Sequence, residues 1–379
     1  MNASFVAQEL IKPTTRVACG IKVMKNQDIL KIENLRRIRL NTFCIRWMVT
    51  NFCNYACDFC IQGSSETKKE AAQTESPETR RIIASKLAEW IEKNINPHQM
   101  VELYLIGGEV TALQDFAQLL STLVNCKFKG VMFFYLTTNL SRPGRYYEDL
   151  CQQFSGRNNR FLSIGASFYR AYTTSEEFGN KLQGLQRFIV HQKHFFPLQR
   201  LSTLLFGRGL VPSHGRNLFL DAGWPILDDD SYQKYLIFKK ETANSGLSVN
   251  PIIMRDYPVT LSSDVQEALK SKNHGGRTRV TSVTGDIVYL SNIQQLGFML
   301  DDVDKFCPQG YVCDAGKDSF SISPDGSVMR CPSLYPPKDF YMGNIADGSF
   351  ELLNESCVCH ANHCSCNYYK QIVWPLCPD

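Results

Sequence analysis

The segment WMVTNFCNYACDFC, residues 47–60, places three cysteines directly after an apolar, β-branched run. Residues 43–49 have the composition of a strand, and Cys53, Cys57 and Cys60 follow it with three and then two residues between them. Three thiolates this close together can hold three corners of a [4Fe–4S] cube, which usually takes four cysteines. A missing fourth protein ligand leaves one iron open, as in catalytic metal sites. We therefore expect a reactive iron–sulfur centre at the carboxyl end of the first strand.

Apolar runs of strand length alternate with helical patterns from this segment to about residue 255. The expected strands are residues 43–49, 101–106, 131–136, 161–166, 201–206 and 247–253, and the expected helices are one that starts at Ser76 and others at 113–124, 146–154, 175–192 and 229–240. Such alternation indicates parallel βαβ units, and roughly six fit here, fewer than the eight of a closed barrel. We predict an α/β fold: a partial (β/α)6 TIM-like barrel with its chemistry at the strand ends, followed by a small Cys-rich C-terminal α+β domain.

The composition limits the classes of partner. The chain has 379 residues, 44% of them hydrophobic, and 41 basic residues against 37 acidic ones give a net charge of +4. This balance favours neither nucleic acid nor an anionic membrane surface. The longest apolar runs, such as residues 131–136, are far shorter than a membrane span, and residues 1–12 lack the pattern of a signal peptide. We therefore expect a cytoplasmic protein, in which 15 cysteines indicate metal ligation or redox chemistry rather than disulfides.

The cysteine motif, with Phe59 before its last cysteine and a strand before its first, resembles the signature of radical S-adenosylmethionine (SAM) enzymes. That resemblance implies that the amino and carboxylate groups of SAM chelate the open iron, and that SAM is cleaved reductively to a 5′-deoxyadenosyl radical. Phe59 would shield the cluster. A zinc knuckle or ordinary buried cysteines are the alternatives, and a zinc site would want a fourth ligand nearby.

A Gly-Gly-Glu segment, Gly107, Gly108 and Glu109, follows the second expected strand. The resemblance extends to this place, since in the family such a segment binds the SAM amino group. The chemistry suits the role, because glycines allow a close backbone approach and a carboxylate pairs well with an ammonium.

Two further residues match the family's order of SAM contacts at strand ends. Asn139 ends the third expected strand, where the family often continues with Gly and this chain has Leu140. Ser167 ends the fourth, where related enzymes carry a Ser that reaches the SAM carboxylate. The resemblance implies SAM contacts for both residues, and ordinary strand-end capping is the alternative.

The C-terminal cysteines resemble those of a SPASM domain, an auxiliary cluster module of many radical SAM enzymes. Eight cysteines lie within residues 307–379, around an expected hairpin at 320–328 with a Pro-Asp-Gly turn. By order, the resemblance assigns Cys307, Cys313, Cys331 and Cys366 to a first auxiliary [4Fe–4S] cluster and Cys357, Cys359, Cys364 and Cys377 to a second. Spacings in the second half are shorter than the family pattern, so a one-cluster twitch domain is an alternative. His360 or His363 could replace a cysteine, and a structural zinc site is a further alternative.

The chain is therefore expected to divide into four segments. Residues 1–42 form an N-terminal extension, 43–255 the radical SAM partial barrel, 256–306 a connector, and 307–379 the SPASM- or twitch-like auxiliary cluster domain.

The resemblance implies a radical SAM oxidoreductase that abstracts a hydrogen atom from a peptide or protein, leading to crosslinking, epimerisation or oxidation. A small molecule such as a sugar is the alternative substrate, and a non-catalytic iron–sulfur electron carrier or a zinc-stapled binding module are the other classes. The implied cofactors are SAM, one catalytic [4Fe–4S] cluster and one or two auxiliary clusters. A reductant such as flavodoxin or ferredoxin is the implied partner. A separate leader-peptide-binding protein is a second implied partner, because about forty residues before the first strand are too few for a leader-binding domain.

Overall fold

The computed structural model describes residues 42–58, 60, 65–191, 218–245, 247–253, 261–271, 278–281, 287–290, 312–313, 315–331, 340–358 and 372–373. Within these residues nine strands form one sheet in the order β12-β11-β10-β1-β2-β3-β4-β5-β6. The six that form the barrel part are parallel: β1 (Thr42–Thr50), β2 (Met100–Gly107), β3 (Met132–Thr138), β4 (Arg160–Ser167), β5 (Leu218–Ile226) and β6 (Ser248–Ile253). Each pairs with the next along the chain, as right-handed βαβ units require. The predicted partial, TIM-like barrel is confirmed.

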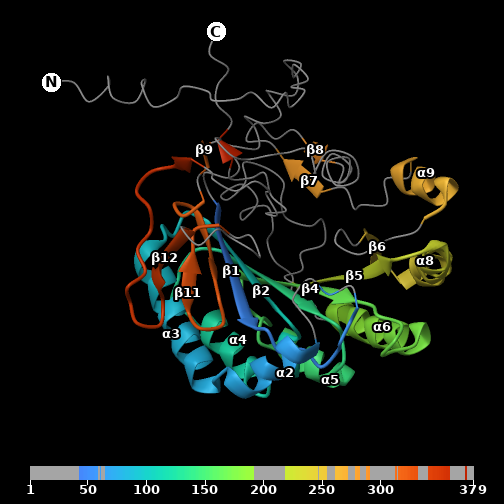
Figure 1. Cartoon of the computed structure of the whole chain (residues 1–379), viewed down its shortest axis with the longest axis horizontal. Helices are drawn as coiled ribbons and strands as arrows, with labels where there is room; N and C mark the ends of the chain where they lie inside the picture. The colour runs from blue at the N-terminus through green and yellow to red at the C-terminus, as the bar shows by residue number, and fades with distance from the viewer. Residues whose placement is uncertain are drawn as a thin grey trace, which may run out of the picture.

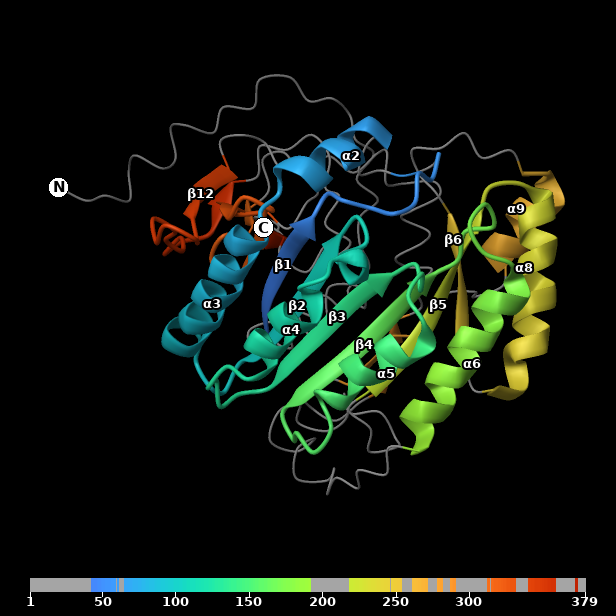
Figure 2. The same ribbon diagram turned by 90° about the horizontal axis from the view of Figure 1, so that it is seen from below.

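Helices cover the outer face of these strands (Figure 2). The connecting helices are α3 (Pro77–Asn94), α4 (Phe116–Val124), α5 (Gly144–Gln152), α6 (Ser175–His191) and α8 (Asp229–Thr242), and α9 (Ser263–Ser271) follows β6. The predicted start of α3 is confirmed, because the Ser76 side chain accepts hydrogen bonds from the backbone N–H groups of Glu78 and Thr79.

Strand residues alternate between the helix-covered core and the inward face of the barrel. In β4 the even-numbered residues Leu162 to Ala166 are fully buried in the core, whereas the odd-numbered residues Ser163 to Ser167 are partly exposed. This period of two follows from strand geometry. Polar side chains at odd positions of β4 therefore face the barrel interior, away from the helices.

The fifth strand is not where the sequence pattern predicted it. The predicted residues 201–206 lie outside the described residues, and the place beside β4 is taken by β5, Leu218–Ile226. This segment contains Gly223 and Pro225, and both residue types are unfavourable inside strands. Propensity therefore pointed to a different segment, while pairing on both sides holds β5 in the sheet.

The C-terminal hairpin continues the barrel sheet on the other side of β1 (Figure 1). β10 (Ser319–Ile322) runs parallel to β1 and antiparallel to β11 (Ser327–Met329), which in turn pairs with β12 (Tyr341–Asn344). The predicted hairpin is confirmed, with Gly326 at a φ of +87° in its turn. Phe320 of β10 packs edge-on against Trp90 of α3, with ring centroids 5.1 Å apart. The hairpin therefore shares the hydrophobic core of the barrel.

The other described elements are small or lie at strand ends. They are α2 (Ser65–Thr74), the 3-10 turn η1 (Val110–Ala112), the pair β7 (Thr278–Thr281) and β8 (Ile287–Leu290), and a three-stranded sheet of β9 (Val312–Cys313), β13 (Cys357–Val358) and β14 (Ile372–Val373). Among the helices that the structure describes, none has the length and apolar character to cross a membrane.

Candidate active site

The cysteine loop, defined here as the described residues from Asn51 to Cys60, leaves the carboxyl end of β1 and is held at its root by the end of β2. The N–H of Gly108 donates to the Thr50 carbonyl and the N–H of Glu109 to the Phe52 carbonyl, each at 2.8 Å. A Cβ on Gly107 would lie 2.2 Å from Thr50 O, and one on Gly108 2.0 Å from Phe52 O. Glycine is thus required here so that two backbones can touch.

Helix α2 and the residue after it approach the same loop from the other side. Glu75 accepts a hydrogen bond from the Asn51 N–H at 2.8 Å and another from the Thr50 hydroxyl. Lys68 is only 3% exposed, and its ammonium donates to the Tyr55 carbonyl at 3.3 Å. The loop is therefore held from two sides. On one side are Gly107 and Gly108 at the end of β2, called the glycine seat below. On the other are the Glu75 carboxylate and the buried Lys68 ammonium of the α2 segment.

The three thiols of the loop are partly exposed near neighbours. The Tyr55 N–H donates to the Cys53 sulfur at 3.4 Å, and the Cys60 N–H donates to the Cys57 carbonyl at 3.2 Å. Burial, and then the neighbouring Cys53 and Cys60, raise the pKa of the Cys57 thiol to about 12, while the Lys68 charge acts in the opposite direction. The three thiols can therefore ionise together only when a positively charged group binds to them.

The donor set fits a cluster better than a single ion. Within the described residues, no three His, Cys, Asp or Glu side chains converge on one point as ligands of a metal ion do. A [4Fe–4S] cube holds its thiolates on separate irons at its corners, so its ligands need not converge. Three soft thiolates beside a buried cation suit an iron–sulfur cluster, and Cys53, Cys57 and Cys60 would hold it.

Glu109 is enclosed rather than open to a ligand. Its side chain is 1% exposed and accepts hydrogen bonds from the N–H and hydroxyl of Thr111, from the Thr138 hydroxyl at 2.8 Å and from the Asn139 N–H at 2.6 Å. Burial raises the pKa of this carboxyl, and these hydrogen bonds partly offset that effect. In this structure Glu109 joins the ends of β2 and β3, and its predicted contact with the SAM amino group stays a prediction.

Asn139 lies against the cysteine loop, as the predicted order of strand ends requires. Its amide donates to the Asn54 side chain at 3.0 Å, and its Oδ1 accepts from the Ser141 N–H at 3.0 Å. Leu140, which stands where the family often has Gly, has a φ of +52°. The backbone thus keeps a left-handed conformation that favours glycine, and such strained residues gather at functional sites.

Ser167 occupies the end of β4, with Gly223 of β5 as its register partner. It lies on the inward face, since its neighbours Ala166 and Phe168 are buried in the core. Among the described residues, none forms a hydrogen bond with its hydroxyl. Ser167 is therefore a predicted SAM contact whose hydroxyl has no partner within the described residues.

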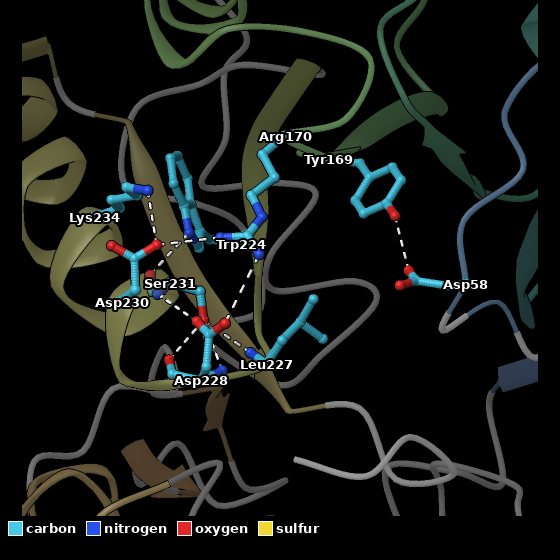
Figure 3. Close-up of polar contacts among 9 residues, drawn as sticks. All are labelled: Asp58, Tyr169, Arg170, Trp224, Leu227, Asp228, Asp230, Ser231 and Lys234. Carbon is cyan, nitrogen blue, oxygen red and sulfur yellow. Dashed lines mark hydrogen bonds and ion pairs between the residues drawn. The ribbon is translucent and has the colours of Figure 1, made fainter. Parts of the chain in front are cut away.

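The segment that follows β4 fastens the far side of the cysteine loop. Tyr169 donates to the Asp58 carboxylate at 2.7 Å, as Figure 3 shows. The Ala56 N–H donates to the Tyr172 hydroxyl at 2.9 Å, and the Tyr172 ring stacks on Tyr55 with centroids 4.1 Å apart. Burial and Asp58 raise the pKa of Tyr169 to about 12. The tyrosine therefore stays a hydrogen-bond donor across the physiological pH range.

The same segment is anchored to β5 and α8. Arg170 forms ion pairs with Asp230 at 3.1 Å and with Asp228 at 3.7 Å, which lie at the start of α8 (Figure 3). Asp228 also caps that helix by accepting a hydrogen bond from the Ser231 N–H at 2.7 Å. These ion pairs are about half exposed, so each adds little to stability. Their geometric effect is to connect the cysteine loop with the opposite wall of the barrel.

Replacement of Glu109 by Gln distinguishes its structural role, which joins the ends of β2 and β3, from its predicted role in SAM binding. An amide can accept through one oxygen only, so one of the donors around Glu109 loses its acceptor, at a cost of about 1–3 kcal/mol in the free energy of unfolding. Denaturant unfolding and SAM affinity measure the two effects. Glu89→Gln, on the exposed face of α3, is the control and should change stability by less than about 0.5 kcal/mol. Weaker SAM binding with unchanged stability would instead assign Glu109 to the ligand.

The auxiliary cysteines are only partly within the described residues. Cys307, Cys359, Cys364, Cys366 and Cys377 lie outside them. Cys313 of β9 and Cys357 of β13 are direct register partners on antiparallel strands, although the resemblance assigned them to different clusters. The division of the eight cysteines between two clusters stays a prediction.

Four residues around the loop were not found by sequence reasoning: Lys68, Glu75, Tyr169 and Tyr172. None belongs to a motif, and each lies outside the expected strands. The cap at Asp228 predicts where α8 begins, but it identifies none of these four residues.

Comparison with known proteins gives one family match and several similar solved structures. Residues 47–167 match the family model of the radical SAM superfamily. No curated protein matches the sequence significantly. Solved structures to which the chain is similar include native anSMEcpe with bound AdoMet, with 14% identity, a TM-score of 0.48, and 81% of this chain and 79% of that chain covered. A second is Streptococcus suis SuiB bound to S-adenosylmethionine, with 11% identity, a TM-score of 0.43, and 91% of this chain and 75% of that chain covered. A third is BtrN in complex with AdoMet and 2-DOIA, with 10% identity, a TM-score of 0.31, and 81% of this chain and 80% of that chain covered.

At TM-scores this low, a likeness decides neither substrate nor reaction. The family match is more specific, because it covers the cysteine loop, Glu109, Asn139 and Ser167. Over residues 47–167 the chain is therefore similar to the domain of the radical SAM superfamily.

Proposed function

We propose that this protein is a radical SAM enzyme in which Cys53, Cys57 and Cys60 hold a [4Fe–4S] cluster and SAM binds beside it at the carboxyl ends of β1 to β4. The observation that carries the proposal is the glycine seat, where β2 presses against the root of the cysteine loop inside the matched domain. When bound, the cluster and SAM supply a 5′-deoxyadenosyl radical that takes a hydrogen atom from a substrate carbon.

The chain's own residues have positional and electrostatic roles in this proposal. Gly107 and Gly108 allow the close backbone contact that fixes the start of the loop. Lys68 places a buried positive charge next to the thiolates, which favours their ionised, ligand-binding form. Ser167 places a hydroxyl, unpaired among the described residues, at the end of β4, two strands from β2.

The finer part of the proposal concerns the substrate and the electrons. We assign a peptide or protein substrate, with one or two auxiliary clusters in the C-terminal region as electron acceptors and a flavodoxin- or ferredoxin-like protein as reductant. This part is supported by the eight C-terminal cysteines and by the hydrogen bonding of β10 directly to β1. That pairing puts the hairpin strand β10 of the Cys-rich region beside the strand that leads into the cysteine loop.

Anaerobic reconstitution followed by reduction with dithionite tests both parts. We expect formation of 5′-deoxyadenosine from SAM and about eight to twelve iron atoms per chain, from two or three cubes of four. Product analysis by liquid chromatography and iron and sulfide determination are the measurements. Four irons with SAM cleavage would keep the enzyme and contradict the auxiliary clusters. Zinc alone, or iron without SAM cleavage, would contradict the proposed function.

A further inference from the structure

Asp221 lies on the inward face of the barrel, and no residue in the described part of the chain is its partner. Thr137, Gly165, Asp221 and Ser248 are register partners across β3, β4, β5 and β6. The neighbours of Asp221 along β5, Leu220 and Ala222, are buried in the helix-covered core, so Asp221 points to the opposite face. Ser167 and its partner Gly223 lie one inward step closer to the strand ends. Asp221 is therefore one level below a predicted SAM contact.

Nothing in the described part of the chain compensates the charge of Asp221. No described residue donates a hydrogen bond to it, and burial alone raises the pKa of its carboxyl to about 6. The described positions on the same face of the neighbouring strands carry no charge: Ser163, Gly165 and Ser167 on β4, and Asn250 on β6. Glu109, by contrast, accepts four hydrogen bonds from described residues. A partly desolvated carboxylate without a partner costs free energy.

Gly165 leaves space directly beside this carboxylate. A Cβ at Gly165 would have as its nearest described neighbours Asp221 Oδ1 at 3.8 Å and the Leu136 carbonyl at 3.9 Å. Both are ordinary contact distances, so the absence of a side chain there is not forced by crowding. The same cannot be said of Gly223, whose Cβ would meet Ile252 Cδ1 at 2.2 Å. Among the described residues, Gly165 therefore places no side chain against the Asp221 carboxylate.

We propose that Asp221 is a substrate-binding residue that recognises an organic cation, an ammonium or guanidinium group, in the barrel interior below the SAM site. The cation would provide the hydrogen bonds and opposite charge that the described residues do not offer, and charge-assisted pairs of this kind are the strong ones. The assignment rests on the proposed function and names the class of its substrate. SAM itself is not the ligand meant, because the proposed function places SAM at the strand ends and Asp221 lies one inward step below Ser167.

Carbodiimide labelling tests the assignment without turnover. The reconstituted full chain is treated with a water-soluble carbodiimide and glycinamide at about pH 6, where a large share of Asp221 is protonated and reactive. Peptide mass spectrometry quantifies the amide. We expect n-butylguanidinium and N,N-dimethyl-n-butylammonium, neither of which forms an amide, to reduce labelling of Asp221 at least about fivefold. The neutral isostere n-butylurea should change it less than about twofold.

A peptide-like pair separates the sources of the cation. Nα-acetylarginine methylamide should protect Asp221 if the cation belongs to a peptide side chain, and its citrulline counterpart is the neutral control. Protection by the small cations alone assigns a free organic cation. Labelling of Asp264, an exposed residue of α9, should not respond. Equal protection by the neutral compounds, no protection by any cation, or an unreactive Asp221 would each overturn the proposal. SAM cleavage is measured separately, so failure of the proposed function shows as absent 5′-deoxyadenosine with protection intact.

Thermal unfolding of Asp221→Asn gives a second, independent measurement. A carboxyl whose pKa is higher in the folded than in the unfolded state stabilises the fold at low pH and loses that contribution as pH rises through about 6. The variant should therefore unfold about 2–4 °C above the native protein at about pH 8 and not at about pH 4. n-Butylguanidinium should raise the unfolding temperature of the native protein only. A variant less stable at about pH 8 would mean that Asp221 has a partner within the protein, contrary to the proposal.

Discussion

Simultaneous replacement of Cys53, Cys57 and Cys60 by Ala abolishes formation of 5′-deoxyadenosine and leaves the protein folded. The fold should survive because the loop is held at its root by backbone hydrogen bonds to Gly108 and Glu109, and not by the thiols. SAM cleavage should fall to the rate seen without protein, because the ligands of the cluster are gone. Product analysis under dithionite and circular dichroism of the metal-free proteins are the measurements.

A matched control removes a thiol that has no part in the loop. Cys151 belongs to α5 and is fully buried in the core, so Cys151→Ala should lower stability by about 1 kcal/mol and keep SAM cleavage. If the triple variant still cleaves SAM under a strong reductant, the assignment of the cluster to this loop is wrong. If the triple variant unfolds while Cys151→Ala does not, the loop has a structural role that the hydrogen bonds do not reveal.

Gly108→Ala is the second change with a large expected effect. The added Cβ would lie 2.0 Å from the Phe52 carbonyl oxygen and 2.8 Å from that of Asn51, and backbone atoms cannot rotate away. The loop root must move, so we expect a loss of about 3 kcal/mol in the free energy of unfolding. SAM cleavage should fall on the order of a hundredfold, because small displacements of a reacting assembly are costly. Denaturant unfolding, bound iron and the cleavage rate check this expectation.

Gly144→Ala is the control for that substitution. Gly144 begins α5 and no described atom lies within 4 Å of its added Cβ, so alanine there should be neutral or stabilise by about 0.5–1 kcal/mol. Normal stability and normal iron content in Gly108→Ala would contradict the glycine seat. Normal stability with lost iron would show that the seat serves the cluster rather than the fold.

The regular part of the barrel and the residues of its motifs could be predicted from sequence. Strands β1 to β4 combine apolar runs with clear boundaries, and the start of α3 carries a Ser-Pro signal. β5 could not be predicted because Gly223 and Pro225 interrupt it and pairing with β4 and β6 overrides their propensity. Secondary structure that depends on neighbours leaves a weak local signal.

The site shows the same limit at the level of side chains. The sequence identifies Glu109 as a carboxylate after two glycines, and the direction in which it points depends on Thr111 and Thr138. Lys68 and Tyr172 reach the cysteine loop from helices and loops that no motif marks. Contacts of this kind arise from packing between distant segments, so spacing along the chain does not encode them.

The pairing of β10 with β1 has a consequence for biosynthesis. β1 ends at Thr50, and its outer partner begins at Ser319. At roughly 5–20 residues per second of translation, that edge of β1 waits about 15 to 55 seconds for its partner. An unpaired strand edge is a template for association with other chains. During this interval the nascent barrel is open to aggregation along the strand that leads into the cysteine loop, until β10 is made and closes that edge.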